Sequence, residues 1–375
     1  MSKEDKKIKS KDKDKKPSTL KNMDDLLLKF QRIPNAEKIF FVQHLSTMIK
    51  SGISLAKALD GLSRQTQNKR FKKVIKSIAE SVERGQSLTD SLKPYDNIFN
   101  ELFINMVRAG EVSGKLEDVL KQLYKQMKKE HKLRAKVRGA LTYPAVIFVA
   151  MVGIGMGVMI FVVPKMIGIF DGVDMELPLM TRILISISDF ITNNGIITVV
   201  SFVLIIFAIM KIIKTKKGKY YFNLGILKMP IISGIIKKIN LARFARTMSS
   251  LLKTDIKIVE SFEITANTLG NVHYKNSLKD AAEKVKKGQE INKLLSAYPK
   301  LYPSMVLQMI SVGEETGELD NILDELASFY EGEVDEVMNT LPTIIEPLII
   351  LVLAAGIGSM AVAIIMPMYA LTNAF

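Results

Sequence analysis

Three long stretches of this sequence contain no charged residue, and they constrain the fold more than any other feature. They are residues 139–164, 190–210 and 347–375. Each reaches the roughly 20 apolar residues that a helix needs to cross a bilayer. A core helix of a soluble domain rarely stays uncharged for so long. We therefore expect three transmembrane helices, at 140–164, 190–210 and 347–371.

The charges that flank these stretches predict their orientation. Residues 1–139 hold 32 Lys and Arg against 17 Asp and Glu, whereas 165–195 holds two basic against four acidic residues. Positive flanks stay in the cytoplasm, so we expect an extracytoplasmic loop at 165–189 and a Lys-rich cytoplasmic linker at 211–242. The Lys-rich extension 1–35 lacks a signal-peptide pattern and is expected to be largely disordered and cytoplasmic. The chain is thus expected to be a multi-pass protein of the cytoplasmic (inner) membrane with an extracytoplasmic C-terminus.

Composition argues against several kinds of chemistry. The chain has no cysteine, which excludes disulfides, thiolate catalysis and Cys-ligated zinc. Its three histidines, His44, His131 and His273, lie too far apart for a metal-ligand spacing. The net charge of +15 lies in the N-terminal tail and the membrane flanks without aromatic interleaving, which favours anionic lipids over nucleic acid as partners. We expect no enzyme active site and no cofactor.

An internal repeat organises the chain. A shift of 203 residues superimposes two halves without an insertion or deletion. Residues that coincide at this shift include Phe41 and Phe244, Lys50 and Lys253, Ile53 and Ile256, Gly85 and Gly288, Leu92 and Leu295, Tyr95 and Tyr298, and Met106 and Met309. The register continues into the apolar stretches. The repeated unit is therefore a cytoplasmic domain, at 36–139 and again at 243–346, followed by one span.

Each copy has a helical pattern throughout. Apolar residues recur at helical spacing between breaks at Gly and Pro, which predicts about six helices joined by short connections. The sixth helix has no breaker before the membrane. The expected fold is an all-α membrane protein with two homologous cytoplasmic six-helix bundles and three transmembrane helices.

A glycine-bounded motif recurs in the two copies. It comprises Gly110, Glu111, Ser113 and Gly114 in the first copy and Gly313, Glu314, Thr316 and Gly317 in the second. The spacing does not fit a Walker A phosphate loop, which needs four residues between its Gly and Gly-Lys. We expect Gly110 to end the fifth helix, with Glu111 near the N-terminus of the sixth and Ser113, or Thr316 in the second copy, as its cap. A cation site or a partner contact at Glu111 and Glu314 remains the alternative.

Three residues mark the membrane boundary. Pro144 and Pro347 stand at the start of the first and third apolar stretches, and Glu346 directly precedes Pro347. An ionisable residue at membrane depth is a functional candidate. Here the side chain can reach cytoplasmic water, so snorkelling or interhelix pairing is favoured over ion translocation.

Taken together, these motifs resemble the type II secretion F and type IV pilus platform proteins (PilC-like). The family pattern includes a Ser-Gly-Ile turn (51–53), a Gly-Gln-Ser-Leu turn (85–88) and the Gly-Glu-x-Ser/Thr-Gly-x-Leu motif in each copy. It also includes a Glu-Leu-Pro-Leu-Met-Thr segment (176–181). The second copy departs from it, with Thr254 and Asp255 at the first turn.

The resemblance implies a non-enzymatic inner-membrane platform. Its implied partners are pilus assembly and retraction ATPases, pilin or pseudopilin subunits, other inner-membrane pilus components and further copies of the chain. Two alternatives stay open, a transporter and a membrane scaffold unrelated to pili. The sequence leaves open whether a pilus, a competence pseudopilus or a secretion system is served.

Overall fold

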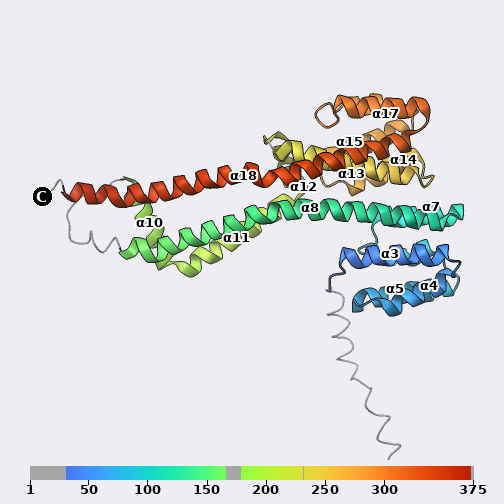
Figure 1. Ribbon diagram of the computed structural model, residues 1–375, viewed down its shortest axis with the longest axis horizontal. Helices are drawn as coiled ribbons and strands as arrows, with labels where there is room; N and C mark the ends of the chain where they lie inside the picture. The colour runs from blue at the N-terminus through green and yellow to red at the C-terminus, as the bar shows by residue number, and fades with distance from the viewer. Residues whose placement is uncertain (1–30, 166–178, 231, 373–375) are drawn as a thin grey trace, which may run out of the picture. The chain divides into compact units, whose positions relative to one another are not determined.

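The computed structural model describes residues 31–165, 179–230 and 232–372 (Figure 1). Most of the extension 1–35 and part of the segment 176–181 lie outside these residues. The regular structure of the described residues is helical. The chain forms two compact units, Met1–His131 with Thr247–Thr268, and Lys132–Arg246 with Leu269–Phe375. The boundary of the units does not follow the repeat, because the start of the second copy belongs to the first unit.

The helices of the two copies keep the predicted register. The first copy contains α3 (Asn35–Lys50), α4 (Leu55–Gln65), α5 (Lys69–Glu83), α6 (Leu88–Leu92), α7 (Glu101–Ser113) and α8 (Leu116–Gly157). The second copy contains α13 (Ile232–Leu252), α14 (Ile258–Thr268), α15 (Val272–Val285), α16 (Ile291–Ser296), α17 (Ser304–Thr316) and α18 (Leu319–Thr372). Helices α4 to α8 each begin 203 residues before their counterparts α14 to α18. The same breaks have therefore produced the same helices twice.

Polar side chains cap several of these helices. The side chains of Asn68, Ser87 and Asn100 accept hydrogen bonds from the first-turn amides of α5, α6 and α7. These bonds satisfy amides that have no partner within the helix. The expectation that Ser113 caps the sixth helix is wrong. Ser113 is the last residue of α7, and its hydroxyl donates to the carbonyl of Ala109 at 2.7 Å. Thr316 likewise ends α17, and its hydroxyl donates to the carbonyl of Val312 at 2.8 Å, so it does not cap the sixth helix of the second copy either.

Aromatic side chains fill matching core positions in the two copies, with one chemical difference. In the first copy, the rings of Phe71 and Phe99 are fully buried, with centroids 6.2 Å apart. Tyr274 and Tyr302 stand at the equivalent positions of the second copy. The Tyr274 hydroxyl donates to the Leu301 carbonyl at 2.7 Å, and the Tyr302 hydroxyl lies 2.8 Å from that of Ser277. Burial raises the pKa of both tyrosines well above the ordinary value of 10.0.

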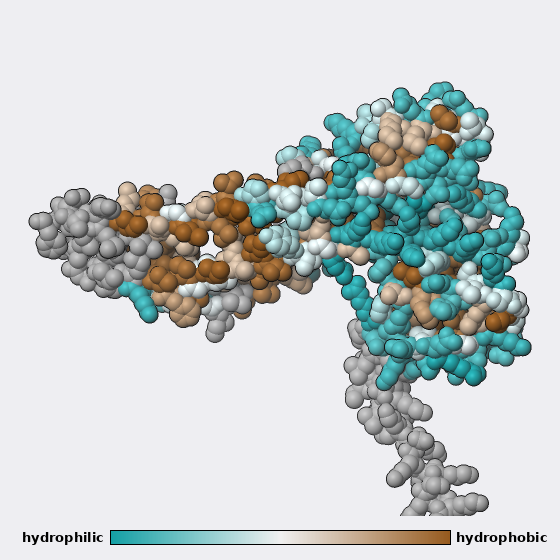
Figure 2. Space-filling model, viewed as in Figure 1, coloured by the Kyte–Doolittle hydropathy of each residue, from teal (hydrophilic) through white to brown (hydrophobic). Residues whose placement is uncertain are grey.

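Two of the described helices, Leu116–Lys165 and Leu319–Ala363, are long and apolar enough to cross a membrane. Their apolar halves expose large hydrophobic side chains, which form part of the brown surface in Figure 2. Each helix begins in a copy of the repeat and continues without a break past its proline, Pro144 or Pro347.

The expected second span at 190–210 falls on two helices and stays a prediction. Its first residues complete α10 (Leu179–Asn193), and the remainder lies in α11 (Gly195–Lys214). Helix α10 thus occupies the later part of the segment expected as a loop, 165–189. The expected linker is helical in α12 (Lys216–Lys228) and the start of α13.

Two hydroxyl groups bond α10 to its neighbours. Thr181 donates to the carbonyl of Ala363 on α18 at 2.7 Å. Ser188 donates to the carbonyl of Met159 at 2.7 Å, in the π-helical turn η2 (Val158–Val162). A π-helical turn disturbs the regular bonding of backbone carbonyls, and polar side chains of a neighbouring helix can satisfy them.

Candidate functional site

The glycine-bounded motif builds the corner between the last two helices of each copy. Gly114 and Gly317 end α7 and α17 in the left-handed conformation, with φ of 69° and 75°. This conformation is strained for residues with a Cβ atom. The corner therefore favours glycine at both positions.

The first glycine of the motif allows close packing. A Cβ atom at Gly110 would lie 3.0 Å from the Val119 side chain and 3.1 Å from the Cα of Leu116. At Gly313 it would lie 3.0 Å from the Cα of Leu319. The expectation that Gly110 ends the fifth helix is wrong, because α7 continues to Ser113. The residue is needed for the contact between α7 and α8.

Glu111 caps a different helix from the one expected. Its carboxylate accepts from the Thr89 amide at 2.8 Å, and also from the Leu88 amide and the Thr89 hydroxyl. These groups form the first turn of α6, not of the sixth helix α8. A carboxylate at this place satisfies two helix amides and complements the positive end of the helix dipole.

Glu314 makes the same contact in the second copy. It accepts from the amides of Ile291 at 2.6 Å and Asn292 at 2.9 Å, at the start of α16. The motif thus ties the fifth helix of each copy to its short fourth helix. Within the described residues, no three His, Asp or Glu side chains gather as metal ligands would. A cation site or a partner contact at these carboxylates stays a prediction.

Glu346 lies in α18 beside Pro347, and its side chain is exposed. Among the residues that the structure describes, Glu346 belongs to no group of three or more His, Asp or Glu side chains that could hold a metal ion. A contact between Glu346 and a partner protein also stays a prediction.

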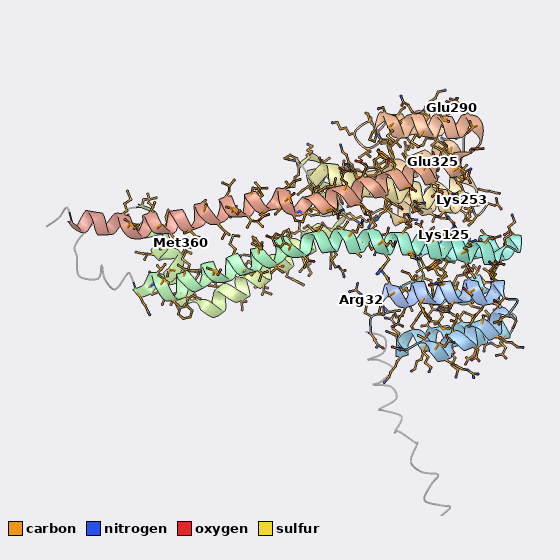
Figure 3. All side chains as sticks on the ribbon, in the orientation of Figure 1. Arg32, Lys125, Lys253, Glu290, Glu325 and Met360 are labelled. Atoms are coloured by element: carbon orange, nitrogen blue, oxygen red, sulfur yellow. The ribbon has the colours of Figure 1, made fainter. Side chains whose placement is uncertain are left out.

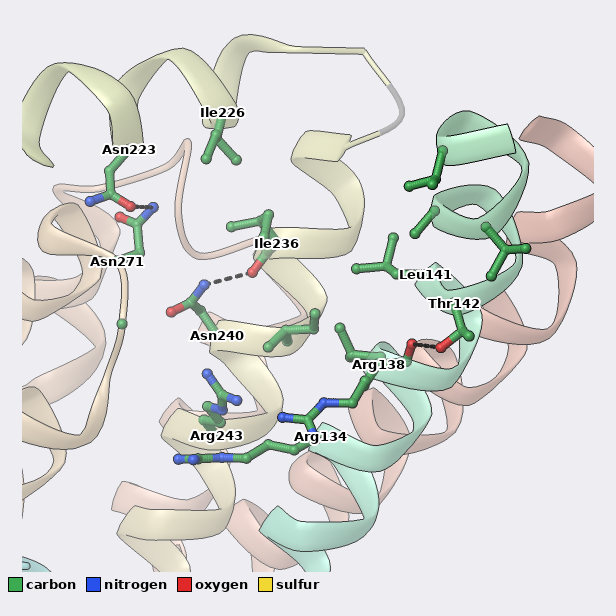
Figure 4. A pocket seen from close by; sticks show the side chains of 16 residues that line it. Arg134, Arg138, Leu141, Thr142, Asn223, Ile226, Ile236, Asn240, Arg243 and Asn271 are labelled. Atoms are coloured by element: carbon green, nitrogen blue, oxygen red, sulfur yellow. Dashed lines mark hydrogen bonds between the residues drawn. The ribbon is translucent and has the colours of Figure 1, made fainter. Parts of the chain in front are cut away.

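A groove lies where α8 passes from its charged part to its uncharged part (Figure 4). Its volume is about 940 Å³, and α8, α12 and α13 contribute most of its lining. Arg134 and Arg138 on α8 and Arg243 on α13 lie together in the close-up, while Leu141 and Ile236 lie further along. The groove therefore combines three guanidinium groups with an apolar wall.

Sequence reasoning missed this groove. Arg134 and Arg138 are four residues apart and precede the first uncharged stretch, which was the available signal. The opposite wall includes Asn223 and Ile226, which lie in the segment expected to be only a linker. An amphipathic groove of this kind can hold an apolar segment together with a negatively charged group.

The fold and these sites define a class of protein: a duplicated, helical membrane protein whose repeated domains continue into apolar helices. The family model for type II secretion system (T2SS) protein F matches residues 41–164 and 244–367, one match in each copy.

Similar proteins agree with this match. The chain is 35% identical to the type IV pilus assembly protein PilC of Thermus thermophilus over 345 residues, which cover 90% of this chain and 85% of the relative. It is 34% identical to PilC of Pseudomonas aeruginosa, with 89% of each chain covered. It is 30% identical to type II secretion system protein F of Vibrio cholerae, covering 91% of this chain and 84% of the relative. The chain belongs to the type II secretion system protein F family, and its role is that of a platform protein in pilus or secretion machinery.

Proposed function

We propose that the chain is the inner-membrane platform on which a type IV pilus or a type II secretion pseudopilus is assembled. In this role it binds assembly and retraction ATPases on the cytoplasmic side and pilin or pseudopilin subunits in the membrane. The names of the relatives, which are assembly and secretion proteins, support this role.

One observation carries the proposal. Helix α8 has 42 residues and α18 has 54, and each joins a helical domain to an apolar stretch without interruption. At about 1.5 Å per residue these helices are roughly 60 and 80 Å long. Movement of a domain under the action of an ATPase is thereby transmitted directly to the membrane.

The proposed topology has three spans, with both copies in the cytoplasm and the C-terminus outside. The asymmetry of Lys and Arg supports it. A single cysteine at Asp174 should react with a membrane-impermeant reagent in intact cells, whereas cysteines at Asn68 and Asn271 should not. The opposite labelling pattern would reject this topology.

We assign pilin binding to the groove at the membrane boundary. Its apolar wall suits a membrane-embedded subunit, and Arg134, Arg138 and Arg243 suit an acidic group on that subunit. Anionic lipid headgroups carry the same charge, so the experiment has to distinguish binding of pilin from binding of lipid.

The test is affinity isolation of the full chain from gently solubilised membranes. The assembly ATPase and the pilin should co-purify with the wild-type chain. The double variant Arg134→Gln, Arg138→Gln should retain the ATPase and lose most of the pilin. Arg84→Gln, at an exposed position of the first copy, is the matched control and should retain both. Equal recovery of pilin with the groove variant would reject the groove, and an effect on bound anionic lipid alone would assign it to lipid. Absence of both proteins from the wild-type preparation would reject the platform role.

A further inference from the structure

The first compact unit contains a contact between the two copies of the repeat. We call residues 101–126, which comprise α7 and the start of α8, the docking face of the first copy. Residues 247–268, which comprise the end of α13 and helix α14, form the receiving face of the second copy. Leu251, Ile256 and Ile264 of the receiving face belong to the same buried apolar cluster as the core of the first copy.

Polar pairs fix the register of this contact. The Gln122 amide donates to the Ser250 hydroxyl at 3.2 Å, and that hydroxyl donates to the Gln126 carbonyl oxygen at 2.9 Å. Lys115 pairs with Asp255 at 3.2 Å. The contact is therefore specific as well as apolar.

Because the chain is a repeat, a second docking face and a second receiving face must exist. The second docking face is residues 304–329, in α17 and the start of α18, and the second receiving face is residues 44–65, in the end of α3 and α4. Their central positions are open to solvent where the paired faces are buried. Gln126 is 6% exposed and its counterpart Phe329 is 43% exposed, while Ile256 is 7% exposed and its counterpart Ile53 is 41% exposed.

The charges of the open faces are reversed on both sides. On the docking side, Glu318 replaces the basic Lys115, and Glu325 replaces the uncharged Gln122. Glu325 is labelled on α18 in Figure 3. The corresponding change on the receiving side replaces Glu260 by Lys57.

Two further basic residues, Lys50 and Arg64, lie on the open receiving face, and Asp60, which pairs with Arg64 at 2.7 Å, is its one acidic residue. Lys50 lies beside Gly52, the counterpart of Asp255, and Arg64 stands where the second copy has Asn267. The acidic open docking face therefore complements the basic open receiving face. The docking face of the first copy, with Lys115, would instead meet like charges there. Such a pattern selects one pairing and opposes the other.

We propose that the open docking face of one chain binds the open receiving face of a second copy of the chain. The contact inside each chain is thus repeated between chains. Since the two faces differ, the contact is heterologous, and it continues from chain to chain until it closes. In the proposed topology, on which this step rests, all chains share one orientation and one depth in the membrane. Successive contacts are therefore related by rotation about the membrane normal, and the assembly is a closed ring.

The absence of native cysteine makes this contact directly testable. Glu325 and Thr47 are the counterparts of Gln122 and Ser250. One full-length chain carries Glu325→Cys and another, differently tagged, carries Thr47→Cys. The two are co-expressed and their membranes are treated with a short bismaleimide, because a glutamine-length side chain separates the two backbones. The pair Gln122→Cys, Ser250→Cys in one chain is the positive control, and Glu80→Cys, exposed on α5, replaces Thr47→Cys as the negative control.

A mixed dimer of the two tagged chains should dominate over self-linked products of either one. A second pair of reporter cysteines, Phe329→Cys in one chain and His44→Cys in the other, tests the charges. With this pair, the double change Glu318→Lys and Glu325→Lys in the docking chain should reduce cross-linking several-fold. The further changes Lys50→Glu and Lys57→Glu in the receiving chain should restore it. No mixed dimer in membranes where the positive control reacts would overturn the proposal. Self-linking of Glu325→Cys as strong as the mixed product would do the same, because it would show a two-fold contact between like faces.

Discussion

Replacement of Glu111 by Gln should loosen α6 while leaving the rest of the first copy in place. The carboxylate accepts three hydrogen bonds at the start of that helix, two from amides and one from the Thr89 hydroxyl. A glutamine keeps one acceptor oxygen but turns an NH₂ group toward a backbone amide, so one amide of α6 loses its partner.

The size of the effect follows from these bonds. A hydrogen bond to a charged group contributes about 1.5–3 kcal/mol, and loss of a helix cap costs about 0.5–2 kcal/mol. Glu111 is half-buried, so we expect about 2 kcal/mol. Glu314 accepts from two amides, because Asn292 stands where the first copy has Thr89. Its replacement by Gln should therefore cost less, about 1–1.5 kcal/mol.

Hydrogen exchange of the full-length protein measures this local change. Because 1.4 kcal/mol is a factor of ten, the amides of α6 should exchange about 30-fold faster in Glu111→Gln, and those of α16 about tenfold faster in Glu314→Gln. Glu80→Gln, an exposed carboxylate on α5, is the control and should change neither helix. Faster exchange at the start of α8 with unchanged α6 would refute the reasoning, since it would show that Glu111 caps the sixth helix after all.

Three further perturbations test the packing of the copies. Gly110→Ala should lower the thermal unfolding temperature, with a loss of about 1–3 kcal/mol, because the added methyl group meets α8 at 3.0 Å; an unchanged melting temperature would mean that α7 and α8 can separate freely. Arg246→Ala should destabilise the second copy by about 1–3 kcal/mol, since Glu331, 2.7 Å from the guanidinium, loses its cation in a partly buried site; proteolysis confined to the second copy measures this, and equal cleavage of both copies would contradict it. Above pH 10 the second copy should lose stability, because tyrosines in the unfolded chain ionise while Tyr274 and Tyr302, whose pKa values are raised by burial, stay protonated in the folded chain. Melting temperatures measured below and above that pH should show this loss in the wild type and a smaller loss in the double variant Tyr274→Phe, Tyr302→Phe. Equal losses in the two proteins would contradict the assignment.

The repeat and the helices could be predicted because their signals are local. Glycine breaks, apolar spacing and uncharged stretches occur within short segments, and they repeat at a fixed shift. The starts of α4 to α8 and α14 to α18 follow that shift without exception.

The role of Glu111 could not be predicted in the same way. Its partners Leu88 and Thr89 precede it by 23 and 22 residues, so only the packing of α6 against α7 brings them together. Local rules assigned the carboxylate to the nearest helix start, that of α8.

Helix α10 was missed for a different reason. It is 15 residues long and carries Arg182 and Asp189, so it lacks the long uncharged pattern of a span. The groove is another tertiary feature, because Arg134 and Asn223 come from separate helices. Neither wall alone has a distinctive pattern.

The most direct test of the platform role removes this chain from cells that retain the assembly ATPase and the pilin. We expect pilin to accumulate in the membrane without forming pili or pseudopili, and the ATPase to shift from the membrane to the soluble fraction. Restoring the wild-type chain should reverse both changes. Normal assembly in its absence, with the ATPase still bound to the membrane, would contradict the account.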